Sequence, residues 1–146
     1  MAAISIINNG EAMSSVRSKL NNVITEVNLL DPTDWIDYSA TSTIVGWSSF
    51  TTKVIKYRVI GKMVFVNFGL NGTSNSATTS FTLPSNNVNA TTLVNGMYAV
   101  NNGVQVRGMS VTTLNSNTIL LFQNESATWT ASGLKYIYGQ FFYEIA

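Results

Sequence analysis

The chain has 146 residues, of which 45% are hydrophobic and 10% are charged, and its formal net charge is +1. This size and hydrophobic content indicate a folded domain with its own core. The low charge gives no electrostatic footprint for nucleic acid, and no apolar run approaches the roughly 20 residues that insert across a membrane. Because cysteine and histidine are both absent, we expect no disulfides, no bound metal and no cofactor.

A helix is predicted directly after residues 8–11, where asparagines can cap its start and an acidic residue can sit in its first turn. Its apolar residues are spaced alternately three and four apart, which is the heptad pattern of a coiled coil. Positions a and d hold Met13, Val16, Leu20, Val23, Val27 and Leu30, and Ile24 at position e widens the stripe. Asp31 and Pro32 end the helix, because a residue before proline disfavours helical geometry.

Two interpretations of this helix remain open at the level of sequence. It can pack on its own β domain, or it can pack on copies of itself. The strict 3.5-residue period and the wide stripe favour self-association, with three copies preferred. A segment of fewer than three heptads is marginal as a coiled coil, so the head must help. We predict a homotrimer with an oligomerisation and attachment region over residues 1–31 and a head over residues 32–146.

The head begins with a turn-rich connector that carries Asp31, Asp34 and Asp37. Their spacing matches no calcium-binding loop, so we expect them to make turn hydrogen bonds and bind no metal. Short alternating segments separated by turn signals follow as far as the C-terminus, which is typical of a sandwich or barrel. The predicted fold class is therefore mainly β, with a short N-terminal helix followed by a jelly-roll-like antiparallel β-sandwich head.

Three hairpins are predicted within this head. The first has a two-residue turn at Gly61–Lys62, as a type II′ turn prefers. Its core face pairs Val59 with Val64, Tyr57 with Val66 and Ile55 with Phe68, and its other face pairs Arg58 with Phe65 and Lys56 with Asn67. The second is expected to have a three-residue turn at 101–103, which places Val100 opposite Val104 and Tyr98 opposite Val106. The third is expected to turn around residues 115–117 and to lead into Thr118–Phe122.

The last segment of the chain is apolar on both faces. Leu134, Tyr136, Tyr138 and Phe142 share one parity, and Ile137, Phe141, Tyr143 and Ile145 share the other. A strand that is apolar on both faces is usually buried on both. We predict that one face meets the core and the other the symmetry axis, and we assign Phe141 and Tyr143 to that interface. Alternatively, Gly139 marks a bulge that exchanges the two faces.

Catalytic chemistry has little support in the residue types present. Nucleophilic catalysis that depends on histidine or cysteine is excluded, and no glycine-rich phosphate loop occurs. Glycoside hydrolysis requires two carboxyl groups around one bond. Five of the seven acidic residues precede the strands of the head, which leaves Glu125 and Glu144. We therefore expect no catalytic residues and no enzyme activity.

Two further groups of side chains are candidates for binding. Lys53, Lys56, Arg58 and Lys62 gather half of the basic residues on the first hairpin. We expect them to form a solvated strand face, with Arg58 stacked over Phe65. Trp35, Trp47 and Trp129 could stack on sugar rings, but tryptophan is mostly buried, so we expect each in the core.

The segment Ile6–Asn21, which reads I-I-N-N-G-E-A-M-S-S-V-R-S-K-L-N, resembles one that recurs near the start of modules in tailed-phage fibre and tail proteins. There an I-N-N-G-E start leads into V-R-x-K-L-N. The head is similar to the small β-sandwich tips of such fibres in three stretches, V-I-G-K-M-V-F-V, G-T-S-N-S and F-T-L-P.

This resemblance implies a homotrimeric fibre of the virion, placed on the tail or the capsid head. Such a fibre is assembled in the host cytoplasm and released by lysis. It contacts other virion proteins through its N-terminal region and adheres to a host surface or glycan. The motif is structural, so no catalytic or receptor-contacting residue is carried over to this chain. The alternative is a monomeric carbohydrate-binding β-sandwich module.

Overall fold

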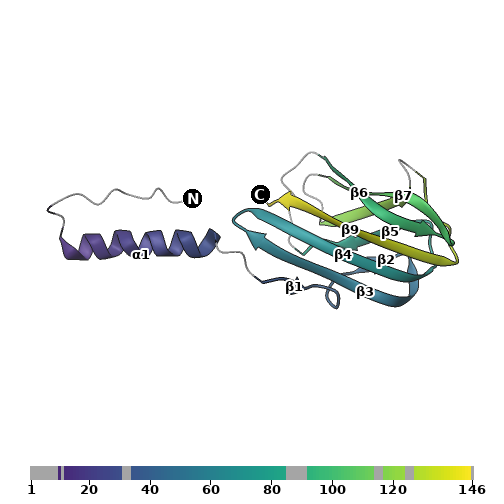
Figure 1. The fold of residues 1–146 in the computed structure, drawn as a ribbon, viewed down its shortest axis with the longest axis horizontal. Coiled ribbons are helices and arrows are strands. Elements are labelled where there is room, and N and C mark those ends of the chain that lie inside the picture. The colour runs from purple at the N-terminus through teal and green to yellow at the C-terminus, as the bar shows by residue number, and fades with distance from the viewer. Residues whose placement is uncertain are drawn as a thin grey trace.

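The computed structural model describes residues 10, 12–30, 34–84, 92–113, 117–123 and 127–145. They form one helix, α1 (Met13–Leu30), and one antiparallel sheet of nine strands, so the chain is mainly β, as predicted (Figure 1). The strands are β1 (Ile36–Asp37), β2 (Ile44–Val45), β3 (Trp47–Ile60), β4 (Met63–Ser74), β5 (Thr79–Thr82), β6 (Thr92–Asn101), β7 (Val104–Thr113), β8 (Thr118–Gln123) and β9 (Leu134–Glu144). Within these ranges, no helix has the length and apolar character to cross a lipid bilayer.

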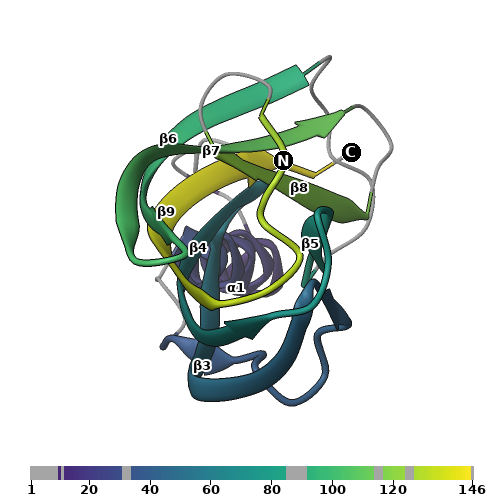
Figure 2. The ribbon, with the colours of Figure 1, turned by 90° about the vertical axis from the view of Figure 1, so that its right-hand side faces the viewer.

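The sheet has the order β1-β3-β4-β9-β6-β7-β8-β5-β2 and curls so that its two edges approach each other (Figure 2). Residues 38–43 alone join the two edge strands β1 and β2. Within this connector, the Tyr38 backbone N–H donates to the Ile55 carbonyl of β3, and the Tyr38 hydroxyl donates to the Leu83 carbonyl beyond β5. The connector therefore ties both edges together, which protects strands that would otherwise offer unpaired backbone groups.

One hydrophobic core fills the inside of the curled sheet. The ring centroids of Phe68 on β4 and Phe81 on β5 lie 5.2 Å apart, although four strands separate β4 from β5 in the sheet order. Phe141 of β9 contacts both rings. The other buried apolar side chains of this core are Trp47, Ile55, Val64, Val66, Leu70, Leu83, Ala99, Ile119, Leu121, Trp129, Ile137 and Tyr143. Burying each large side chain contributes about 1.5–3 kcal/mol.

The predicted first hairpin is confirmed residue by residue. β3 and β4 pair in the expected register, with Val59 opposite Val64 and Arg58 opposite Phe65. Gly61 has φ +59°, which suits the first central position of a type II′ turn. The predicted core face is buried or half-buried against the core. Alternation and turn chemistry are both local, so together they determine this register.

The predicted second hairpin forms between β6 and β7, but its predicted three-residue turn and register are wrong by one residue. Asn101 pairs with Val104 and Val100 with Gln105, so the turn has two residues, Asn102 and Gly103. Their φ angles are +50° and +81°, which is the geometry of a type I′ turn. Asn-Gly is the preferred pair for that turn, because both central residues need positive φ. In the third hairpin, β7 pairs with β8 as expected, but residues 115 and 116 lie outside the described residues.

Strand β9 pairs with β4 without a register shift through Gly139, so the predicted alternative of a bulge there is wrong. Phe141 and Tyr143 are buried in the head's own core. Their assignment to an interface between copies is therefore corrected, since side chains enclosed by their own domain cannot meet a second copy. The outward face of β9 carries Tyr138, which is 39% exposed, and Phe142, which is 55% exposed.

Candidate functional site

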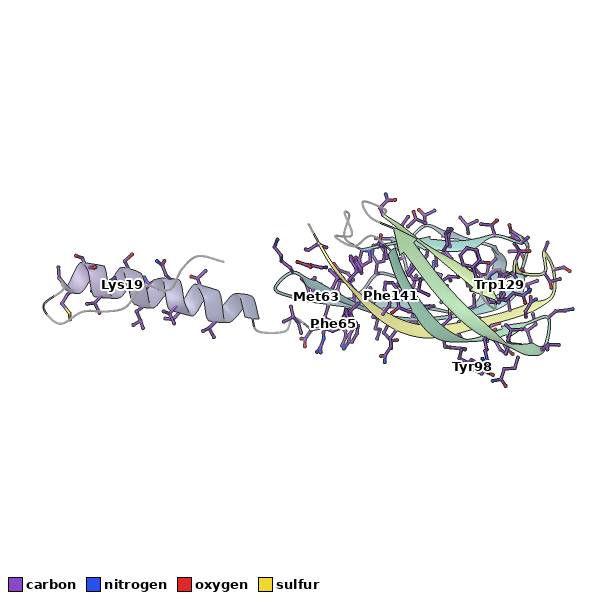
Figure 3. All side chains as sticks on the ribbon, turned by 90° about the horizontal axis from the view of Figure 1, so that it is seen from above. Lys19, Met63, Phe65, Tyr98, Trp129 and Phe141 are labelled. Carbon is purple, nitrogen blue, oxygen red and sulfur yellow. The ribbon has the colours of Figure 1, made fainter. Side chains whose placement is uncertain are left out.

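The apolar stripe of α1 is uncovered in the single chain. Met13, Leu20, Ile24 and Val27 are 81%, 52%, 50% and 56% exposed, and Val16 and Val23 are partly exposed. The side chain of Leu30 lies outside the described side chains. Helix α1 extends away from the head and covers neither face of the sheet (Figures 1 and 3). An exposed apolar stripe of this kind usually marks a protein contact surface.

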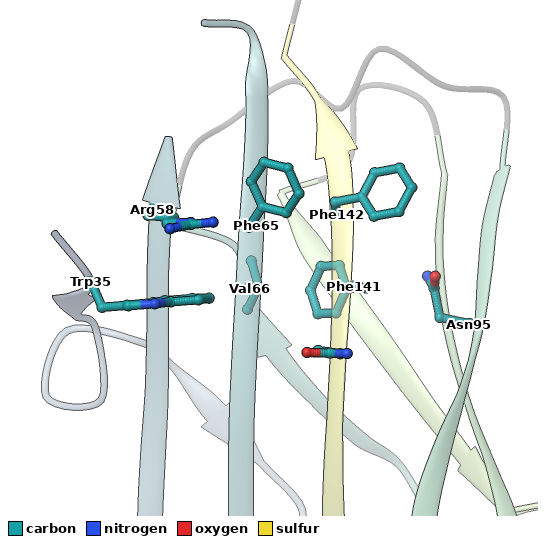
Figure 4. Close-up of a pocket in the computed structure, with 8 residues that line it drawn as sticks. Trp35, Arg58, Phe65, Val66, Asn95, Phe141 and Phe142 are labelled. Atoms are coloured by element: carbon teal, nitrogen blue, oxygen red, sulfur yellow. The ribbon is translucent and has the colours of Figure 1, made fainter. Parts of the chain in front are cut away.

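A second exposed surface lies on the outside of the sheet, and we call it the aromatic row. It consists of Trp35, Arg58, Phe65 and Phe142, which come from neighbouring segments (Figure 4). The Arg58 guanidinium carbon lies 5.5 Å from the Trp35 ring and 5.6 Å from the Phe65 ring. The rings of Phe65 and Phe142 lie 6.0 Å apart. The predicted stacking of Arg58 on Phe65 is confirmed.

The aromatic row borders an open groove of about 380 Å³, whose other lining residues include Asn95 and Gln140. The groove exists because β9 pairs with β6 only over Lys135–Tyr138, beyond which the two strands have no ladder. The Nε atom of Arg58 and the Nδ2 atom of Asn95 are buried and have no hydrogen-bond partner. Both atoms lie beneath the surface of the groove wall, where a donor without an acceptor is costly.

The three tryptophans divide between the core and the surface. Trp47 and Trp129 are buried, as expected, whereas Trp35 is 45% exposed, so the prediction for Trp35 is wrong. Trp35 immediately precedes the edge strand β1, where Arg58 covers one side of its ring. The exposed tryptophan therefore belongs to the aromatic row, and the two buried ones enclose a cation.

That cation is Lys135, which sequence reasoning missed. Its Nζ lies 4.2 Å from the Trp47 ring and 5.5 Å from the Trp129 ring, and it donates to the Gly46 carbonyl (2.6 Å) and the Thr79 hydroxyl (2.7 Å). Lys135 is fully buried, and burial lowers its pKa to about 8. Parity was the available signal, because Lys135 lies on the same face of β9 as the inward side chains of Ile137, Phe141 and Tyr143.

A hydrogen-bond network beside Lys135 holds the segment 127–133 on the sheet. The Asn101 amide donates to the Gln123 side chain (2.7 Å) and the Thr130 hydroxyl (3.0 Å). The indole N–H of Trp129 donates to the Leu121 carbonyl (2.7 Å). These groups satisfy one another, so the network stabilises this end of the head.

The acidic side chains of the connector make turn contacts where they are described. The Asp37 carboxylate accepts from the Ser39 backbone N–H (2.8 Å), and hydrogen bonds from Ser39 hold the pKa of Asp37 below its ordinary value. Asp31 lies outside the described residues, among which no cluster of three acidic side chains occurs. Glu125 is also outside them, and Glu144 lies exposed at the end of β9.

Lys53, Lys56 and Lys62 are exposed on the first hairpin, which fits the solvated strand face that we predicted.

No protein-family model matches the chain, and no curated protein matches it significantly. Among the described residues, the stripe of α1 and the aromatic row are the two surfaces suited to association.

Proposed function

We propose that this chain is a structural fibre protein of a tailed phage, built as a homotrimer with its helices together and its heads displayed outward. The observation that carries the proposal is the heptad stripe on α1, which the chain's own head leaves exposed. The resemblance of Ile6–Asn21 to phage fibre modules supports the virion context and an attachment role for the N-terminal region. In this proposal the curled head is a jelly-roll-like tip.

The length of the helix agrees with a trimer that is stabilised by both the helix and the head. An 18-residue helix is about 27 Å long, which is marginal as a coiled coil by itself. Position e adds Ile24 to the a and d residues, and a wider stripe is buried better by two neighbouring helices than by one. Three copies are therefore the expected stoichiometry.

Sedimentation equilibrium of the purified full chain at micromolar concentration tests the proposal. We expect a trimer for the wild type and a monomer for Leu20→Asp/Val23→Asp, because charges on the stripe cannot be buried. Ser18→Asp/Asn21→Asp is the matched control, since it adds the same charges at the same spacing on exposed positions outside the stripe. A wild-type monomer, or a trimer that both double variants retain, contradicts the helical interface.

A monomeric carbohydrate-binding module is the second candidate function, favoured by the exposed rings of Trp35 and Phe142, because exposed aromatics stack on sugar rings. Adhesion to a host glycan is also part of the fibre proposal, so oligomeric state separates the two candidates. A monomer that binds a glycan on an array, and loses that binding in Trp35→Ala, would establish the module and contradict the fibre. A trimer that binds no glycan would retain only the structural role.

A further inference from the structure

We infer that the aromatic row is a second contact surface between copies of this chain, which packs head against head next to the helices. The inference rests on the proposed function, because it takes the trimer from the stripe of α1 and assigns the head's share of the interface. Three observations carry it: the composition of the row, its distance along the chain from the helix, and the charges at its two ends.

The composition of the row is that of the centre of a protein interface. Trp35 and Phe142 are large and exposed. Aromatic residues and arginine are enriched at interface centres, where lysine and carboxylates are depleted. The groove beside the row is lined by neither lysine nor carboxylate.

In a trimer, the short connection between helix and head keeps the aromatic row of each copy close to the three-fold axis. Leu30 is at a d position, and Trp35 follows it by five residues, which span at most about 18 Å. Helices in a bundle lie about 8–10 Å apart, so three copies of Trp35 must stay near the common axis. The row also lies at the helix-proximal end of the head, where Figure 3 labels Met63 and Phe65.

Arg58 near one end of the row and Glu144 beyond the other carry opposite charges, and Asp34 and Asp37 flank Trp35 at the Arg58 end. Trp35 and the Arg58 cation form one end, and Phe142 the other, with Glu144 two residues further on the same face of β9. A three-fold ring uses two different patches for each contact, so the Arg58 end of one copy meets the Glu144 end of the next. A weakly hydrated guanidinium stacked on rings is well suited to burial in such a contact.

The test compares Phe142→Asp with Val104→Asp in the full chain by sedimentation equilibrium. Val104 is 65% exposed at the opposite end of the head, so it is a matched exposed apolar position. We expect Phe142→Asp to weaken trimer association by about tenfold or more and Val104→Asp to leave it unchanged. Circular dichroism checks that both variants fold. Equal association of the two folded variants would overturn the inference.

Charge exchange provides a second measurement. Arg58→Glu and Glu144→Arg should each weaken association, and the double variant should recover most of it, because the two ends then attract again with reversed signs. A double variant that is as weak as the sum of the singles would contradict the predicted pairing of the two ends.

The outcomes also separate this inference from the proposed function. An oligomer lost in Leu20→Asp/Val23→Asp but kept in Phe142→Asp overturns the head contact alone. An oligomer lost in Phe142→Asp but kept in the helix variant supports the head contact and removes the proposed role of the helix. A Phe142→Asp trimer of full affinity that has lost glycan binding would make the row a ligand surface and overturn the inference.

Discussion

The two ends of the head hold a cation against aromatic rings in different ways. At the far end, Lys135 is enclosed by two indoles and donates to two oxygen atoms of its own chain. At the helix-proximal end, Arg58 lies between Trp35 and Phe65, but its Nε has no acceptor and the Trp35 ring remains exposed. The Lys135 ammonium is therefore held by its own chain, although the indole N–H of Trp47 beside it is buried without a partner. The two sites differ in exposure, because Trp47 and Trp129 are buried and Trp35 is 45% exposed.

The strand pairing explains the difference. At the far end, β9 is hydrogen-bonded to both β4 and β6, and the segment 127–133 covers the core. Toward the helix, β9 keeps β4 but has no ladder with β6. The core is therefore closed at one end and bordered by a groove at the other.

The largest expected effect tests whether the two aromatic sites contribute differently to the free energy of unfolding. Trp129→Ala should lower the free energy of unfolding by about 3–5 kcal/mol, because it opens a cavity beside Lys135 and removes the bond to Leu121. Trp35→Ala should cost less than about 1 kcal/mol, since its ring is already exposed. Urea denaturation in the Leu20→Asp/Val23→Asp background removes the contribution of assembly. Equal losses of unfolding free energy in Trp129→Ala and Trp35→Ala would contradict the difference between the two sites.

The next effect concerns pH at the far end. The pKa of Lys135 is about 8 in the folded chain and 10.5 as the reference value, so between these values the unfolded chain binds more protons. Stability should therefore rise with pH across this window, by up to about 3 kcal/mol. Lys135→Met should lack this rise. The unfolding free energies of the wild type and Lys135→Met, measured from pH 7.5 to 10, test this prediction. The same pH dependence in both proteins would contradict it.

A smaller effect is expected at the turns. Gly103→Ala places a side chain at φ +81° in the type I′ turn and should cost about 1–2 kcal/mol. Gly96→Ala has open space and no positive φ, so its effect should stay within about 1 kcal/mol. Thermal melts of both variants compare the two positions. A Gly96 variant that loses more stability than the Gly103 variant would contradict the turn assignment.

The smallest effect is expected at Arg58 in the monomeric background. Arg58→Ala should change stability by about 0.5–1 kcal/mol, because a partly exposed cation–π contact is weak. In the trimer the same substitution should weaken association as well, since the guanidinium lies in the proposed contact. Urea denaturation and sedimentation on the same samples separate the two effects. A loss as large as that of Trp129→Ala would show that the row is structural.

Sequence alone determined the features that depend on neighbours along the chain. The register around Gly61–Lys62 follows from alternation and turn preference, and the stacking of Arg58 on Phe65 follows from that register. The heptad spacing determined the stripe of α1 in the same way. Each is a pattern of a few residues, whose geometry is set by the period of a helix or a strand.

Tertiary structure decided what depends on distant segments. Parity separates Phe141 from Phe142, but only the curl of the sheet shows which of them meets the core. The same curl buries Trp47 and Trp129 around Lys135 and leaves Trp35 outside. Burial depends on strands brought together from across the chain, and the pairing that does this is non-local. A local pattern therefore predicts the faces of a strand, whereas the fold determines which face is covered.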